Sequence, residues 1–189
     1  MKQTAESFRS ILILLLVLWG VFFADLLLPW NLASFGIYPR TLSGLIGIPL
    51  HPFLHGSMGH LISNSIPLVV LTWLLFAAYG KRTYGLMTGF VLLGGLLVWV
   101  FGRSAFHIGA SGLIYAEAAF LVAMGIMARR FLDLLVALLV IFLYGGMVWG
   151  VLPVNPYVSW EGHLMGVIAG VFIAIQMRKG APAQKRRRV

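Results

Sequence analysis

Six long apolar runs constrain what this 189-residue chain can fold into. Each is close to the roughly 20 residues that a helix needs to cross a hydrocarbon core of about 30 Å. The runs occupy residues 10–28, 60–80, 84–101, 111–128, 131–150 and 161–177. The composition agrees, because 60% of the residues are hydrophobic and only 10% are charged, whereas about a quarter are charged in soluble domains. The sequence therefore predicts an integral membrane protein.

We expect all of these runs to be helices. Strands with open edges would leave backbone N–H and C=O groups unpaired in lipid, and the runs lack the alternating pattern of a barrel strand. The predicted fold is an all-α bundle of six transmembrane helices over residues 10–178, with a cytoplasmic N-terminal segment 1–9 and a basic cytoplasmic tail 179–189. The first run is expected to be a retained helix, since no small-residue cleavage site precedes its end.

The basic residues predict how the bundle is oriented. The net charge of +9 could indicate nucleic-acid binding, but the lysines and arginines gather at every second connection instead. These clusters lie at residues 2–9, 81–82, 129–130 and 178–188. Because basic connections stay in the cytoplasm, we expect both termini there and a multi-pass topology. The connections expected outside are 29–59, 102–110 and 151–160. The first is long and partly apolar, which favours a position in the membrane interface.

Three polar clusters stand at the starts of the second, fourth and sixth runs. They are His60 with Asn64, the Gly-Ala-Ser-Gly segment 109–112, and the Gly-His-Leu-Met-Gly segment 162–166. Along an ideal helix each lies about 23 to 32 Å from the basic residues at the other end of its run. All three are therefore expected in the outer third of the membrane. Such side chains are costly in hydrocarbon, so they indicate a functional site.

Small residues predict that the fourth and sixth runs pack closely together. At intervals of three or four residues these runs carry Gly112, Ala116, Ala119 and Ala123, and Gly162, Gly166 and Gly170, respectively. Small residues at this spacing let two helix backbones approach each other in lipid. Ser111 and His163 stand at the tops of these two stripes, so we expect them to meet.

A serine beside a neutral histidine can perform nucleophilic catalysis, because the imidazole removes the hydroxyl proton. Ser111 is the candidate nucleophile and His163 the candidate base. The oxyanion formed by attack on an amide needs donors aimed at it, and the N–H of Ser111 at the start of its helix is one. His60 and Asn64 share a helix face and could add two more. The alternative for that pair is an interhelical hydrogen bond that holds the bundle.

The carboxylates are poorly placed to complete a triad. Glu117 follows Ser111 by about 9 Å along the helix and lies on another face, so we expect it to be protonated or paired within the bundle. Glu161 precedes His163 and is expected to be a favourable charge at a helix N-terminus. The sequence therefore predicts a two-residue Ser–His site.

The sequence lacks the residues that other kinds of intramembrane catalytic site require. The chain has no cysteine and no His-Glu-x-x-His string, which argues against thiol and zinc proteases. His51 and His55 have helical spacing but no acidic residue close by, so we interpret them as residues that order the loop. Asp25 and Asp133 are expected at opposite membrane faces, which excludes a paired-aspartate site. We expect neither a metal nor a cofactor.

Taken together, these segments resemble the rhomboid family of intramembrane serine proteases. The resemblance rests on residues 55–64 (His-Gly-Ser-Met-Gly-His-Leu-Ile-Ser-Asn), on 109–112 with Tyr115, and on 162–166 with Gly170. It covers the core from the first run to the sixth. It implies a rhomboid-like six-helix bundle with an interfacial first outer loop. It also implies an endopeptidase that cleaves transmembrane segments near the outer face through an acyl-enzyme.

The resemblance carries over to individual residues. It implies that Ser111 and His163 form the catalytic dyad. The oxyanion donors would be His60, Asn64 and backbone N–H groups near Ser111, including that of Ala110. The supporting residues would be Gly109, Gly112, Tyr115, which would stack on His163, Gly166 and Gly170.

The chain also departs from the family pattern. Family members often carry a Trp-Arg pair in the first outer loop, whereas here Trp30 is followed by Asn31, and Arg40 comes further along. Gly145 and Gly146, near the outer end of the fifth run, make that run our candidate for a side gate that admits substrate.

Two other functions use the same residues. A rhomboid-like protein could bind client membrane segments without cutting them, although both dyad residues are present here. A transporter could use His60, Glu117 and His163 as a proton relay, although the polar residues cluster on one side of the membrane. The expected partners are transmembrane substrates and the lipid bilayer, and not nucleic acid. We expect a bacterial or archaeal plasma membrane, with the site open to the outer side.

Overall fold

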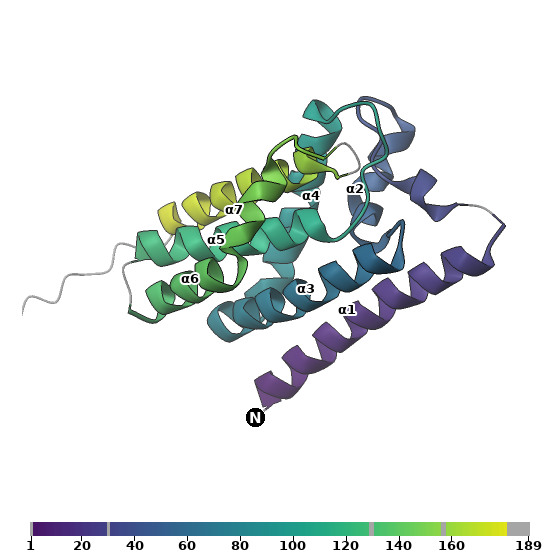
Figure 1. Ribbon diagram of the computed structural model, residues 1–189. Coiled ribbons are helices and arrows are strands. Elements are labelled where there is room, and N and C mark those ends of the chain that lie inside the picture. Colours follow the sequence, from purple (N-terminus) through teal and green to yellow (C-terminus); the bar gives the residue numbers. More distant parts are fainter. Residues whose placement is uncertain (1, 30, 129–130, 156–157, 181–189) are drawn as a thin grey trace, which may run out of the picture.

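The computed structural model describes residues 2–29, 31–128, 131–155 and 158–180, which form helices joined by turns (Figure 1). The α-helices are α1 (Lys2–Leu27), α2 (Gly47–Leu50), α3 (Met58–Tyr79), α4 (Arg82–Phe101), α5 (Ser111–Ala128), α6 (Phe131–Tyr144) and α7 (Trp160–Lys179). The 3-10 helices are η1 (Leu32–Phe35), η2 (Ser43–Leu45), η3 (His51–Phe53) and η4 (Gly145–Val151). Three features singled out in the sequence lie outside the described residues: Trp30, the Arg129-Arg130 pair and the basic tail from residue 181 onward.

The helices confirm a multi-pass membrane protein. Among the described residues, five helical segments are long and apolar enough to cross a membrane. They are α1, α3, α4, the combined α6–η4 segment and α7. The remaining predicted run, 111–128, forms α5, whose apolar part at Ser111–Met127 is slightly shorter. The six predicted runs thus correspond to the six long helical segments of the bundle.

Two helix boundaries differ from the predicted runs. Helix α1 begins at Lys2, ahead of the apolar run that starts at residue 10. A salt bridge of 3.1 Å between Glu6 and Lys81 ties this first part of α1 to the α3–α4 turn. Helix α6 ends at Tyr144, and the rest of the fifth run continues as the 3-10 helix η4. The change begins at Gly145 and Gly146, since glycine weakens α-helices.

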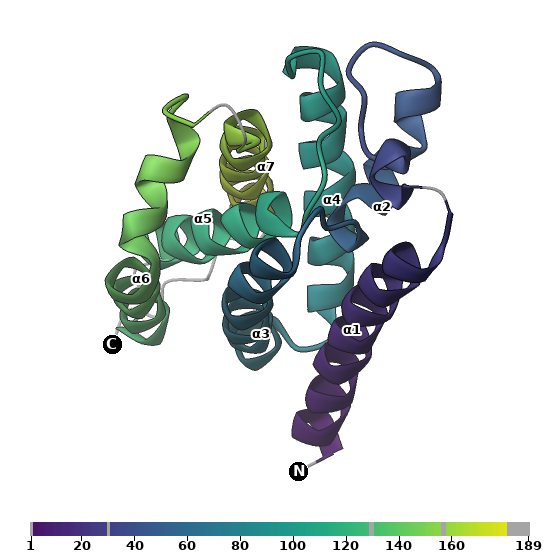
Figure 2. The same cartoon turned by 45° about the vertical axis from the view of Figure 1, so that its right-hand side comes forward.

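Helix α5 occupies the middle of the bundle, with α3, α4, α6 and α7 around it, while α1 lies at the edge beside α3 (Figures 1 and 2). The most extensive contact of α5 is with α7. A Cβ atom added to Gly166 would overlap the carbonyl oxygen of Gly112, and one added to Gly170 would overlap that of Ala116. The two backbones are therefore in direct contact, as the small-residue spacing predicts.

Glu117 is fully buried between α5 and α3. The hydroxyl of Thr72 donates a 2.8 Å hydrogen bond to its Oε1 atom. This confirms that Glu117 is paired within the bundle. The contact also joins α5, which carries Ser111, to α3, which carries His60 and Asn64. It lies further along both helices than those three residues.

The long connection before α3 is anchored on the end of α4 and on the connection 102–110 that follows it. Ile37 and His107 exchange two backbone hydrogen bonds of 3.0 and 2.9 Å. The guanidinium of Arg40 donates to the carbonyl oxygens of Val100 at 3.2 Å and Gly102 at 2.7 Å. Arg40 holds this position with a positive φ of 59°, which is uncommon outside glycine. The loop thus has an arginine anchor, although that arginine does not follow a tryptophan.

The contact between α5 and α7 generates a stability prediction. Gly170→Ala would force the α7 backbone away from the carbonyl oxygen of Ala116, so we expect a loss of about 1 to 3 kcal/mol of stability. The matched control is Gly20→Ala in α1, where nothing lies within 4 Å of the added Cβ; it should leave stability unchanged or raise it slightly. Thermal unfolding of the purified variants measures both. Equal melting temperatures for the two variants would contradict the close packing.

Candidate active site

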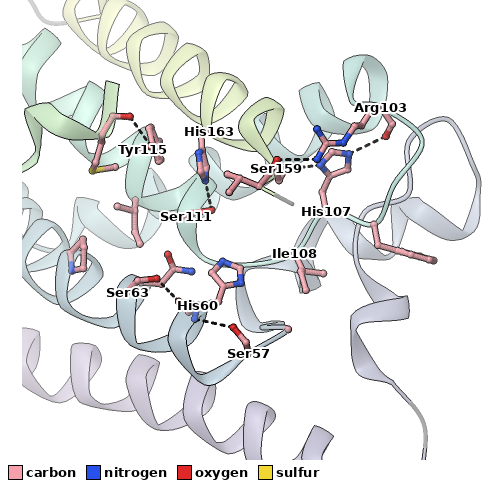
Figure 3. A pocket seen from close by; sticks show the side chains of 17 residues that line it. Ser57, His60, Ser63, Arg103, His107, Ile108, Ser111, Tyr115, Ser159 and His163 are labelled. Atoms are coloured by element: carbon pink, nitrogen blue, oxygen red, sulfur yellow. Dashed lines mark hydrogen bonds between the residues drawn. The ribbon is translucent and has the colours of Figure 1, made fainter. Parts of the chain in front are cut away.

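The side chains of Ser111 and His163 meet at the end of the bundle where α5 and α7 begin (Figure 3). The Oγ atom of Ser111 lies 2.9 Å from Nε2 of His163. Ser111 is the first residue of α5, and His163 lies in the first turn of α7. The direct backbone contact between these helices, lower down at Gly166 and Gly170, keeps their first turns close together.

A backbone carbonyl determines which nitrogen of His163 carries the proton. Nδ1 of His163 lies 2.8 Å from the carbonyl oxygen of Gly150. Because a carbonyl oxygen can only accept, Nδ1 must be protonated. In the neutral ring Nε2 is then an acceptor, and it faces the hydroxyl of Ser111. The orienting group is thus part of the main chain in η4, and a carboxylate is not needed for this role.

Tyr115 fixes the plane of the same ring. Its ring stacks on that of His163, with 4.2 Å between centroids and 10° between planes. The hydroxyl of Tyr115 donates a 2.8 Å hydrogen bond to the carbonyl oxygen of Met147. Two carbonyls of η4, those of Met147 and Gly150, therefore hold the stacked pair. The segment expected to act as a side gate is in direct contact with the histidine.

A cavity of about 650 Å³ opens beside Ser111 and His163. Its walls come from α3, α5 and α7, from η4 and from the connection 102–110. Most polar lining residues are serines and histidines, and Arg103 is the lining residue with a fixed charge. The cavity is large enough for a short stretch of extended peptide with water beside it. The side chains of Ser111 and His163 both line this space.

His60 and Asn64 line the cavity from the first turns of α3. The side-chain nitrogen of Asn64 lies 3.0 Å from Nε2 of His55. The backbone N–H of Ala110 also points at that nitrogen, at 3.5 Å. Burial, with a contribution from His60, lowers the pKa of His55 to about 4, so His55 is neutral at ordinary pH. His55 can therefore accept from Asn64 and hold its amide in place.

Two expectations for the residues around this pair have different outcomes. His51 does order the loop, because its Nδ1 lies 2.8 Å from the Ile48 carbonyl and its own carbonyl accepts from Gly109 at 2.8 Å. Gly109 has a φ of +107°, and an added Cβ would lie 2.6 Å from the His60 ring. The N–H of Ala110, in contrast, is directed at His55. Its role as an oxyanion donor stays a prediction.

Five polar groups at the site were missed in the sequence. They are the carbonyls of Met147 and Gly150, and the side chains of Arg103, His107 and Ser159. The two carbonyls have no side-chain signal, whereas Ser159 could have been recognised as the residue that caps α7. Glu161 is in the first turn of α7, as expected, and its carboxylate lies 3.4 Å from the guanidinium of Arg103.

The described histidine and carboxylate side chains do not form a metal site. Within residues 2–29, 31–128, 131–155 and 158–180, no three such groups come together. The chemistry that the arrangement supports comes from its own groups: a serine hydroxyl, a neutral imidazole that accepts its proton, and hydrogen-bond donors across the cavity. A nucleophile, a base and donors for an oxyanion are the groups that acyl transfer requires.

Comparisons with known proteins identify the family of this chain. A family model described as "Rhomboid domain" matches residues 42–180. An uncharacterized protein of Mycobacterium tuberculosis is 40% identical over 161 residues, which cover 80% of this chain and 66% of that protein. An uncharacterized protein of Mycobacterium leprae is 37% identical over 187 residues, which cover 94% of this chain and 73% of that protein. The chain therefore spans just under two thirds of the length of the M. tuberculosis protein.

The support given by η4 leads to a prediction. A Cβ at residue 150 would overlap the hydroxyl of Tyr115 and lie 3.1 Å from Nδ1 of His163. Gly150→Ala should therefore displace the carbonyl that orients the base, and slow the modification of Ser111 by a fluorophosphonate about 10- to 100-fold. Gly85→Ala in α4 is the control, because nothing lies within 4 Å of its added Cβ. Equal labelling rates in both variants would show that the carbonyl does not orient His163.

Proposed function

The chain belongs to the rhomboid family, and we propose that it is an intramembrane serine endopeptidase that cleaves transmembrane segments of other membrane proteins. The observation that carries the proposal is the 2.9 Å contact between Ser111 Oγ and the Nε2 atom of His163. It is supported by the Gly150 carbonyl, which leaves Nε2 free to take a proton. The proposal of proteolytic activity rests on this geometry as well as on the family, because some rhomboid-like proteins are inactive.

The reaction follows from the protonation state of His163. Ser111 Oγ attacks the scissile carbonyl carbon while Nε2 takes the hydroxyl proton. The tetrahedral intermediate collapses, the C–N bond breaks, and Nε2–H gives its proton to the leaving amine. Water then attacks the resulting ester, with His163 again acting as base, and releases Ser111. The Gly150 carbonyl stabilises the imidazolium that forms in each step.

The oxyanion is stabilised by donors on the α3 and α5 sides of the cavity. In our proposal these are the side chains of His60 and Asn64 and the backbone N–H of Ser111. Ser111 is the first residue of α5, so its N–H has no carbonyl to bind within the helix. The Asn64 amide has two N–H groups. One points to His55, and the second remains for the substrate.

We further propose that the cavity opens toward the outer side of a plasma membrane. The salt bridge between Glu6 and Lys81 lies at the end of the bundle opposite the cavity, together with the basic residues at the end of α7. Basic ends face the cytoplasm. On the cavity side, Phe35 and Leu42 are exposed in the long connection, which supports its position in the membrane interface.

Cleavage of a model single-span membrane protein tests the proposed activity. The purified parent should cut this substrate, whereas Ser111→Ala and His163→Ala should lose activity by at least about 10³-fold, since each removes a reacting group. Cleavage is measured by gel and mass spectrometry of the fragments. Intact substrate that binds equally well to all three proteins would instead support a client-binding protein. Ion flux in vesicles that survives Ser111→Ala would support a transporter.

The oxyanion assignment has a separate test. Asn64→Ala and the isosteric Asn64→Asp both remove the amide donor, so each should lower kcat about 10²-fold while leaving KM nearly unchanged. Thermal unfolding shows whether the loss of the hydrogen bond to His55 affects the fold. If either variant retains the kcat of the parent, Asn64 only holds the connection at His55 in place and does not stabilise the oxyanion.

A further inference from the structure

A second hydrogen-bonded cluster lies on the cavity wall opposite His60, between the connection 102–110 and the start of α7 (Figure 3). Its centre is His107. Nδ1 of this histidine lies 2.6 Å from the hydroxyl oxygen of Ser159, and Nε2 lies 3.1 Å from the carbonyl oxygen of Arg103. Neither His107 nor Ser159 takes part in the mechanism above, although both line the catalytic cavity.

Ser159 connects this cluster to the catalytic base. It is the N-cap residue of α7, and its hydroxyl oxygen accepts a 3.3 Å hydrogen bond from the N–H of Gly162. Its carbonyl oxygen accepts a 3.2 Å hydrogen bond from the N–H of His163. The position of Ser159 therefore determines where the first turn of α7 starts, and hence where the imidazole of His163 lies.

The protonation state of His107 follows from its two partners. The carbonyl oxygen of Arg103 can only accept, so Nε2 carries a proton. In the neutral ring, Nδ1 then accepts the hydroxyl proton of Ser159, and the lone pairs of Ser159 remain for Gly162. Burial lowers the pKa of His107 below its ordinary value, against the opposing effects of the Arg103 carbonyl and the Glu161 carboxylate. The neutral form that this bonding requires is therefore favoured.

His107 is itself held firmly. Its backbone exchanges two hydrogen bonds with Ile37, of 3.0 and 2.9 Å, in the connection before α3. Next to it, the guanidinium of Arg103 donates a 2.9 Å hydrogen bond to the carbonyl of Val158 and pairs with Glu161. The loop that leads into Ser111 is thus tied to the segment that leads into His163. Ser111 and His163 lie on the two sides of this link.

We propose that His107 is a positioning residue of the active site, which acts through Ser159 to set the first turn of α7 and so the distance between His163 and Ser111. This inference rests on the proposed serine-protease function and extends it. A displacement of about 1 Å between reacting groups can cost as much as 100-fold in rate. The effect of His107 should therefore appear in the chemical step more than in substrate binding.

The test compares substitutions at both ends of the link in the full-length protein. His107→Leu fills the space but cannot accept from Ser159. His107→Asn places its Oδ1 atom where Nδ1 was and can accept. Ser159→Ala removes the partner, and the double variant His107→Leu/Ser159→Ala shows whether the two residues act together. Ser104→Ala in the same connection is the control, since its hydroxyl is exposed and makes only a 3.4 Å contact with Arg40. The measurements are the rate of Ser111 labelling by a fluorophosphonate, kcat and KM with a single-span substrate, and thermal unfolding.

We expect His107→Leu to lower the labelling rate and kcat about 10-fold, with KM within about two-fold of the parent. His107→Asn should recover most of this loss. The double variant should be no slower than Ser159→Ala, because His107 acts through that hydroxyl.

Labelling of His107→Leu at the parental rate would overturn the inference. A double variant whose loss of rate is the product of the losses in the two single variants would overturn it too. If His107→Leu does not fold, two other variants test the inference. Ser159→Ala must then be labelled slowly and His107→Asn at a rate close to that of the parent; any other result overturns the inference. A parent that is not labelled at all would overturn the proposed function, and this inference with it.

Discussion

The hydrogen bond from His163 to the carbonyl oxygen of Gly150 is the interaction on which the site depends. It assigns the ring proton to Nδ1, and only then can Nε2 accept the proton of Ser111. Serine–histidine sites often use a buried carboxylate for this task, but a carboxylate near the membrane interior carries a high desolvation cost. A backbone carbonyl provides a fixed acceptor without a net charge. The stacked ring of Tyr115, held by the neighbouring Met147 carbonyl, limits the remaining rotation of the imidazole.

The packing of α5 against α7 is the second requirement, because it determines how close the side chains of Ser111 and His163 can come. Lipid provides no hydrophobic drive for helices to associate, so close backbone contact and hydrogen bonds must hold them together. Gly166 and Gly170 allow this contact because they have no side chain between the two backbones. The pair formed by Thr72 and Glu117 adds a polar link from α5 to α3. Helices α3, α5 and α7 therefore present their first turns to one cavity.

Much of this arrangement could be predicted from the sequence because the membrane limits the choices. The apolar runs located the helices, and the small-residue stripes indicated that the helices of Ser111 and His163 would meet. What could not be predicted was contributed by the backbone. The Gly150 carbonyl has no side-chain signature, and the change from α6 to η4 that positions it depends on how Gly145 and Gly146 are used. The contact between the Ala110 N–H and Nε2 of His55 also depends on the path of the loop, which residue types alone do not determine.

The most direct test of this account is the tautomer of His163, measured by nitrogen NMR on protein labelled with ¹⁵N-histidine, with the resonances assigned by comparison with His163→Gln. The account predicts a neutral ring near pH 7 that is protonated at Nδ1 and unprotonated at Nε2, and a loss of this preference in Gly150→Ala. A ring protonated at Nε2, or at both nitrogens, in the resting protein would leave Ser111 without a base and would contradict the account.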